Sequence, residues 1–232
     1  MRNNTLLLLG VVLALAAVPC MATEITFAEF DTISGPDITV SYSLVASVPT
    51  NTITESASVN FEYLNMTPPF GLSGTLPATL VINASTTAPD GEVTSDSHGN
   101  LSQYDYAGNF SIVLRIPYGG YPAGYLLLSG NFGPIESELN GRVSSLTFSD
   151  STPPVGEVEF SSNALQFGNG DEGLSLNLTG INNTAINAEG MFSGFSASDT
   201  GGFSANVIPE PFSFLLLGSG LVGLGLLRRK LR

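Results

Sequence analysis

The sequence predicts an all-β body, an antiparallel β-sandwich or jelly-roll-like domain, with an N-terminal signal peptide before it and a short C-terminal transmembrane helix after it. In the middle of the chain apolar residues alternate with Ser, Thr, Asn and Glu at a period of two, which is typical of half-buried strands. Clusters of Pro, Gly, Asn and Asp separate these runs, and one long apolar run stands near each end. With 232 residues the chain can form one large domain.

The N-terminal apolar run has the features of a Sec-type signal peptide. Residues 5–18 are almost purely aliphatic, and the small residues Cys20 and Ala22 stand three and one positions before a cut at Thr23. A buried core helix, the alternative, needs a polar face that this run lacks. We therefore expect the Sec translocon to export the chain and residues 1–22 to be removed, together with the only cysteine.

Residues 23–195 are expected to form the exported β-rich domain. The alternation predicts strands at 25–30, 38–44, 59–63, 80–82, 110–114, 125–128, 143–148, 158–160, 165–167, 174–178 and 191–195. The turn clusters between them are 34–37, 67–69, 88–91, 118–121, 152–154 and 168–171. A domain boundary at 150–154 would leave too few residues after it for a second core, so one domain is predicted. Residues 196–206, rich in Ser, Gly and Ala, are expected to form a flexible stalk.

The last part of the chain has three components in a fixed order. Pro209, Glu210 and Pro211 form an extended segment, because the prolines exclude helix. Residues 212–227 carry no charge, and as a helix rising about 1.5 Å per residue they would cross a hydrocarbon core of about 30 Å only marginally. Four basic residues follow, which the positive-inside rule places in the cytoplasm: Arg228, Arg229, Lys230 and Arg232.

This order closely resembles the PEP-CTERM sorting signal, which exosortase-type membrane enzymes of Gram-negative bacteria recognise. The resemblance covers residues 207–232 and does not extend to the body. It implies that the protein is held transiently in the inner membrane, is cut near Pro209 to Pro211, and passes to the cell surface or an exopolysaccharide matrix. A permanent single-span anchor is the alternative interpretation.

The charge of the chain excludes one class of partner. The formal net charge is −13, and every acidic residue except Glu210 lies between residues 23 and 207, where Arg115 and Arg142 are the only basic ones. Binding of duplex nucleic acid needs a cluster of Lys and Arg, so it is excluded. A strongly acidic body stays soluble and repels anionic partners unless divalent cations bridge them.

Two pairs of carboxylates have the spacing that would suit glycan cleavage. Glu157 with Glu159, and Glu136 with Glu138, would lie on one face of a strand, as the paired acids of glycosidases require. Against this reading, the chain has no tryptophan for a sugar-binding platform. Outward-facing carboxylates that discourage edge-to-edge pairing explain the same residues, and no catalytic residue is predicted.

The remaining chemistry of the body is limited. His98 is the only histidine, it stands in a turn-like segment without a nucleophile elbow, and we expect it to be solvated. One histidine and no cysteine in the mature chain exclude a zinc site. Calcium is the only metal left open, through Asn169, Asp171 and Glu172, although a tight hairpin turn before Leu174 is the favoured explanation of these residues. No cofactor is otherwise expected. Asn-x-Ser/Thr triplets occur at Asn65, Asn83, Asn100, Asn109, Asn177 and Asn182, and are attributed to composition.

Taken together, these features favour an exported, non-enzymatic protein of the cell surface or of an extracellular, biofilm-type matrix, with an exosortase-type enzyme, the Sec translocon and exopolysaccharide as partners. The alternative is a secreted glycan-binding or glycan-active protein, calcium-dependent in one version. Turnover of a polysaccharide that is lost on Glu159→Gln would identify the enzyme.

Overall fold

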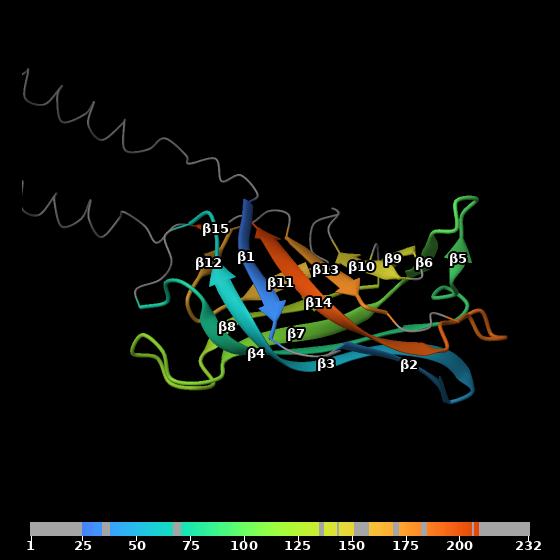
Figure 1. Ribbon diagram of the computed structural model, residues 1–232, viewed down its shortest axis with the longest axis horizontal. Coiled ribbons are helices and arrows are strands. Elements are labelled where there is room, and N and C mark those ends of the chain that lie inside the picture. Colours follow the sequence, from blue (N-terminus) through green and yellow to red (C-terminus); the bar gives the residue numbers. More distant parts are fainter. Residues whose placement is uncertain are drawn as a thin grey trace, which may run out of the picture.

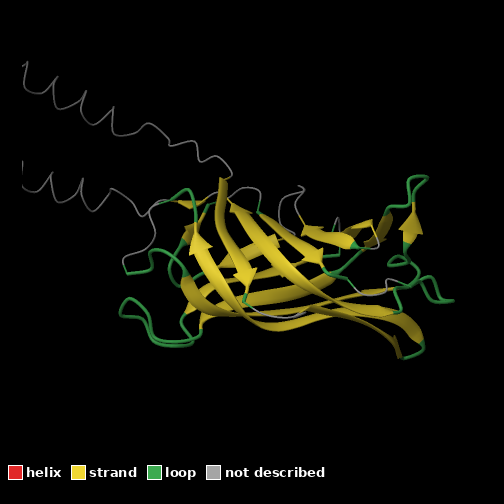
Figure 2. Cartoon of the chain, in the orientation of Figure 1, coloured by secondary structure: helices red, strands yellow, loops and turns green. Residues whose placement is uncertain are grey.

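The computed structural model describes residues 25–33, 38–66, 71–134, 137–142, 144–150, 158–168, 172–181, 185–205 and 207–208. Every regular element within these ranges is a β-strand (Figure 2). The strands are β1 (Ile25–Thr32), β2 (Ile38–Val45), β3 (Val48–Tyr63), β4 (Leu76–Thr87), β5 (Thr94–Ser95), β6 (Leu101–Tyr104), β7 (Ala107–Leu114), β8 (Leu126–Phe132), β9 (Glu138–Arg142), β10 (Ser145–Asp150), β11 (Val158–Ser161), β12 (Gln166–Phe167), β13 (Gly173–Thr179), β14 (Gly194–Ala205) and β15 (Val207–Ile208).

The strands form one large antiparallel sheet, which confirms the predicted all-β class. Its order is β11-β8-β7-β4-β3-β1-β14-β13-β10-β9-β6-β5, and β2 pairs with both β3 and β14. Strands β1 and β2 thus lie one after the other in the space between β3 and β14, β1 beside the C-terminal part of β3 and β2 beside its N-terminal part (Figure 1). A separate two-stranded sheet is formed by β12 and β15.

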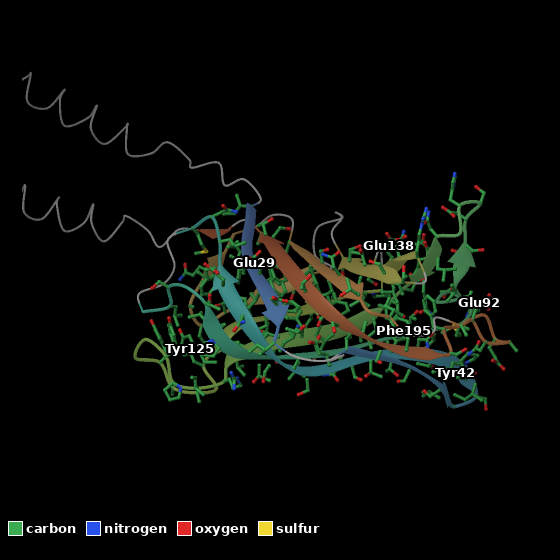
Figure 3. All side chains as sticks on the ribbon, in the orientation of Figure 1. Glu29, Tyr42, Glu92, Tyr125, Glu138 and Phe195 are labelled. Carbon is green, nitrogen blue, oxygen red and sulfur yellow. The ribbon has the colours of Figure 1, made fainter. Side chains whose placement is uncertain are left out.

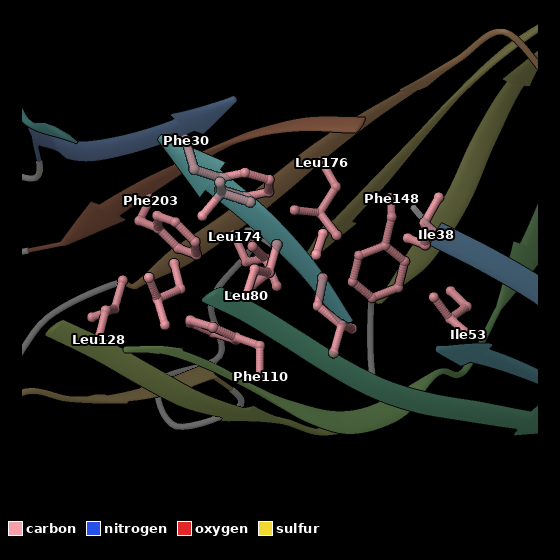
Figure 4. Packing of buried hydrophobic residues seen from close by; sticks show 14 of the residues in the cluster. Phe30, Ile38, Ile53, Leu80, Phe110, Leu128, Phe148, Leu174, Leu176 and Phe203 are labelled. Carbon is pink, nitrogen blue, oxygen red and sulfur yellow. The ribbon is translucent and has the colours of Figure 1, made fainter. Parts of the chain in front are cut away.

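The sheet folds over on itself, so that its two halves enclose the core. The ring of Phe110 on β7 stacks on that of Phe203 on β14 with centroids 5.1 Å apart, although β4, β3 and β1 stand between these strands in the sheet order. Phe160 on β11, at one end of the sheet, likewise packs edge-on against Phe27 on β1 at 5.8 Å. Figure 4 shows the apolar side chains that fill the space between the halves. Burial of this apolar surface is the main force that stabilises the fold.

Several predicted strands agree closely with the observed ones. The predictions 25–30, 38–44 and 174–178 correspond to β1, β2 and β13, and in each the inward positions are apolar. The prediction 191–195 is wrong in its start, because Met191 and Phe192 are buried in the turn before β14, which begins at Gly194.

The predicted stalk at 196–206 is wrong for residues 196–205, which belong to β14, a strand inside the sheet. Its small residues fit a tightly packed layer: a Cβ atom on Gly201 would lie 2.3 Å from Cε1 of Phe30 and 2.8 Å from Cδ2 of Leu176. The Ser and Gly content that resembled a linker is therefore a packing requirement. The body extends at least to Ala205, where the sequence analysis had ended it at residue 195.

Candidate functional site

The signal-peptide cut at Ala22 and Thr23 and most of the sorting signal lie outside the described residues. The sorting-signal residues concerned are Pro209, Glu210 and Pro211, the apolar segment 212–227, and Arg228, Arg229, Lys230 and Arg232. Their roles stay predictions. Within the described ranges no helix has the length and apolarity needed to cross a bilayer.

The structure does place the points at which the chain enters and leaves the body. Ile25, at the start of β1, pairs with Ala205, at the end of β14 (Figure 1). Val207 and Ile208 then form β15 against β12. Both ends of the described chain are therefore attached to the same end of the sheet.

His98 lies in the exposed turn between β5 and β6, as the sequence predicts. Asp96 organises this turn: one carboxylate oxygen accepts hydrogen bonds from the backbone N–H groups of His98 (2.8 Å) and Asn100 (2.9 Å). The other oxygen accepts from Nδ2 of Asn100 at 2.7 Å. The backbone and side-chain hydrogen bonds from Asn100 are the main causes that lower the pKa of Asp96.

The Asp96, Ser97 and His98 side chains do not form a catalytic triad. A triad needs the carboxylate and the hydroxyl on opposite nitrogens of the imidazole. Here Oδ2 of Asp96 (3.8 Å) and Oγ of Ser97 (3.4 Å) both approach Nδ1, and the His98 side chain is 79% exposed. The group is a solvated turn.

The carboxylate pairs proposed for glycan cleavage are only partly described. Glu159 is exposed on β11 and Glu138 is half-buried on β9, whereas Glu157 and Glu136 lie outside the described residues. The alternative hypothesis, in which Glu157 works with Glu159, is therefore not tested by the structure.

Glu172, one of the three residues through which calcium was left open, contacts the strand that carries Glu159. Its Oε2 accepts a hydrogen bond from the backbone N–H of Phe160 at 2.5 Å. Burial raises the pKa of Glu172, the hydrogen bond from Phe160 opposes this shift, and the negative charge of Glu159 adds to it. The other two calcium candidates, Asn169 and Asp171, lie outside the described residues.

Three carboxylates that the sequence analysis did not single out face the interior. Glu55 on β3, Asp150 on β10 and Asp199 on β14 are 4%, 1% and 1% exposed. Asp199 lies opposite Leu178 and Asp150 opposite Leu174, so about 13 Å of strand separates these two acids. Among the described residues no three His, Cys, Asp or Glu side chains come together as a metal site.

A buried polar network joins β3 to the loops at the end of the sheet away from Ile25. Nε2 of Gln103 donates to Oδ1 of Asn51 (2.8 Å) and to the carbonyl of Gly91 (2.7 Å). The hydroxyl of Tyr106 donates to Oε1 of Gln103, and Nδ2 of Asn51 donates to the carbonyl of Phe192 at 2.9 Å. Because each amide is hydrogen-bonded at both its oxygen and its nitrogen, the network fixes structure rather than offering a reactive group.

The outer surface of one half of the sheet is made almost entirely of short, uncharged polar side chains. We call it the polar face and define it by residues of β2, β3, β4, β7 and β8: Thr39, Ser41, Thr52, Thr54, Ser56, Ser58, Thr79, Asn83, Ser85, Asn109, Ser111, Ser129 and Asn131. Figure 3 shows the outward side chains of β2 and β3 along the lower edge of the molecule. Val81, Val113 and Ala107 lie among these residues. Asn60 and Glu62 at the end of β3, and Glu159 on β11, stand at the borders of the face.

The polar face is ordered in rows that run across the strands. The central row is formed by directly opposed residues of five successive strands: Thr39, Thr54, Asn83, Asn109 and Asn131. All five side chains are exposed. In a neighbouring row Oγ of Ser41 and Oγ1 of Thr52 lie 3.2 Å apart, within hydrogen-bond distance.

A shallow hollow lies in the middle of this face. Its volume is about 280 Å³, and its lining includes Thr52, Thr54, Asn83, Ser85 and Asn109. Ala107 and Gly108 form its remaining side on β7, where no long side chain projects into it. The hollow therefore presents hydroxyl and amide groups around an open depression.

Comparison of the chain with protein-family models, with curated proteins and with solved structures gave no match.

Proposed function

We propose that the chain is an exported, non-enzymatic protein of the cell surface or extracellular matrix, which an exosortase-type enzyme sorts at its C-terminus. The observation that carries the proposal is the order of Pro209-Glu210-Pro211, the apolar segment 212–227 and the basic end 228–232 at the end of the sequence. The signal-peptide features of residues 1–22 support export of everything between the two apolar runs.

Each component of the tail has its own physical task in this proposal. The basic residues hold the end of the chain in the cytoplasm, and the apolar segment fixes the depth of the chain in the membrane. The two prolines keep the peptide around Glu210 extended at the outer membrane surface, so that the processing enzyme can reach it. Cleavage there releases the body.

The attachment of both described chain ends to one end of the sheet is compatible with this sequence of events. If the tail is in the membrane, the end of the body that carries Ala205 and Ile25 lies nearest the membrane, and the opposite end of the sheet lies farthest from it. We assign the two facing halves of the folded sheet to the β-sandwich type, in which two layers of strands enclose one core.

A second candidate function, binding of glycans without cleavage, is favoured by the polar face. Hydroxyl and amide side chains both donate and accept hydrogen bonds, and so do the hydroxyl groups of sugars. Glycan binding is compatible with a matrix role. It does not require cleavage of the tail, whereas the sorting proposal does.

Intact-mass measurement of the protein recovered from the cell surface tests the sorting proposal. The expected mass lacks residues 1–22 and everything beyond about Pro211. Glu210→Ala should leave an uncut precursor in the inner membrane, whereas Glu189→Ala, which changes an exposed glutamate of the body, should be processed normally. A surface protein that still carries Arg232, or a Glu210→Ala variant that is cut like the wild type, would contradict the proposal.

A further inference from the structure

The polar face needs an explanation because it lacks the charges that ordinarily cover a soluble protein. About a quarter of the residues of a typical protein are charged, whereas 12% of this chain is charged, with a net charge of −13. The acidic and basic side chains of the other half of the sheet include Asp31 on β1 and Arg142 on β9. Glu29 and Glu138, on the same two strands, are labelled in Figure 3. Among the outward side chains of β2, β3, β4, β7 and β8 only Glu62, near the end of β3, is charged, so solubility alone does not account for the composition of this face.

The register turns these residues into a regular array. Neighbouring strands lie about 4.8 Å apart, and alternate residues on one strand lie about 6.8 Å apart, so the face repeats hydrogen-bonding groups at fixed spacings in two directions. Each Asn amide offers donors and an acceptor, and each Ser or Thr hydroxyl offers both. The central row from Thr39 to Asn131 and the hollow beside Asn83 and Asn109 belong to the same array.

We propose that the polar face binds a neutral, hydroxyl-rich polysaccharide, with the chain of the polymer lying across the strands and one sugar seated in the hollow. Sugar hydroxyls both donate and accept hydrogen bonds, which matches the amides and hydroxyls of the face. A polymer repeats these groups along its length, so several rows engage it together and individually weak contacts add up to useful avidity.

The charge distribution selects a neutral polymer over an anionic one. The face contains no Lys or Arg to pair with carboxylate or sulfate groups, and the surrounding acidic chain repels them. Because the face has no aromatic platform, it would hold sugars through hydrogen bonds alone. A protein partner is disfavoured, because stable protein interfaces centre on aromatic and Arg side chains that this face lacks.

This inference rests on the proposed matrix role for the origin of the polymer, but the surface can be tested without reference to sorting. The full chain, kept in solution by a polyoxyethylene detergent that carries no sugar, is run in native gels cast with hydroxyethyl cellulose, galactomannan or dextran. Gels cast with alginate, an anionic polysaccharide, are run in parallel with and without calcium. We expect retardation by at least one neutral polymer, unchanged by EDTA, and none by alginate in EDTA.

The variants compare a pair of exposed asparagines of the polar face with a control pair on the other half of the sheet, in which Asn177 is exposed and Asn140 is half-buried. Asn83→Ala/Asn109→Ala removes two adjacent amides of the polar face, and Asn140→Ala/Asn177→Ala removes two on the other half of the sheet. The first pair should lower the association constant at least fivefold, and the second should leave it within twofold. Asn83→Asp/Asn109→Asp, which keeps side-chain size, should lower it further. Thermal unfolding within a few degrees of the wild type confirms that each variant is folded.

Several results would overturn the inference. They are an absence of retardation in all three neutral polymers, retardation by alginate alone, or an equal loss in both alanine pairs. Concentration-dependent self-association that Asn83→Ala/Asn109→Ala abolishes would show instead that the face binds a second copy of the chain. None of these results changes the mass of the processed protein, so a failure here is distinguishable from a failure of the sorting proposal.

Discussion

Phe110 and Phe203 stack with their ring planes inclined by 25°, and they join two strands that have three other strands between them in the sheet. The contact exists only if the sheet folds over. In a double-mutant cycle of Phe110→Leu and Phe203→Leu we expect a coupling free energy of about 0.5–1.5 kcal/mol in urea unfolding. The matched pair Phe110→Leu and Phe192→Leu should be additive, because the Phe192 ring packs on Phe195 near the other end of β14. Additivity in the first cycle would contradict the closed arrangement.

Gly201 and Gly202 are neighbours on β14, but only Gly202 has room for a side chain. Gly201→Ala should destabilise the fold by about 1–3 kcal/mol, because the added Cβ would lie 2.3 Å from Cε1 of Phe30. Gly202→Ala is the control, since its Cβ would have no neighbour nearer than 3.9 Å. Urea unfolding measures both. Equal effects would show that β14 is not packed between these side chains.

Tyr106→Phe tests the buried polar network. Removal of the hydroxyl leaves Oε1 of Gln103 buried without its donor, which should lower the free energy of unfolding by about 1–3 kcal/mol. Tyr104→Phe, at a side chain that is 40% exposed, should change it by less than about 0.5 kcal/mol. A neutral Tyr106→Phe would mean that the network contributes little to stability.

Glu172 makes the stability depend on pH in an identifiable direction. Its folded-state pKa is raised above the ordinary value of 4.5, so the native state favours the protonated form. The contribution of protonated Glu172 to the free energy of unfolding is therefore fully present below pH 4.5 and is lost as the pH rises through the folded-state pKa. Glu172→Gln should be more stable than the wild type at neutral pH, by less than about 1 kcal/mol because the group is partly solvated, and the difference should vanish below pH 4.5. A destabilised variant at pH 7 would show that the hydrogen bond from Phe160 to the carboxylate outweighs burial.

The turn between β2 and β3 holds two residues in the left-handed region without glycine. The φ angles are 50° at Ala46 and 69° at Ser47, the conformation that favours Asn-Gly in two-residue hairpins. Ala46→Asn/Ser47→Gly should raise the free energy of unfolding by about 1–2 kcal/mol. Ala46→Val, a β-branched change at the same site, should lower it. Thermal unfolding of the two variants checks the opposite signs.

The sequence predicts a strand well where the inward residue is large and apolar, as along β1, β2 and β13. It misses strands whose inward residues are small or polar. The first half of β3 carries Asn51 and Glu55 on its inner side, and β14 carries Gly201 there, so the alternation is weak at both places. The side chains that pack against these positions come from the facing half of the sheet, so a local sequence pattern cannot reveal them.

The Asn-x-Ser/Thr triplets have a physical origin that composition alone does not give. Asn83 with Ser85, Asn109 with Ser111, and Asn177 with Thr179 each lie two residues apart on one strand. Residues at this spacing share a face. These three triplets therefore follow from strands with a polar outer side, and two of them, at Asn83 and Asn109, belong to the polar face. Its assembly into rows across five strands depends on register and could not be predicted.

The position of β14 determines how the body responds to a mechanical load. A pull on the C-terminal chain passes through β15 and then along the axis of β14. On one side β14 is hydrogen-bonded to β13, and on the other to β1 and β2 in succession. Such a pull shears many backbone hydrogen bonds at once instead of opening them one after another. The strand nearest the tail is thereby the one best placed to bear tension.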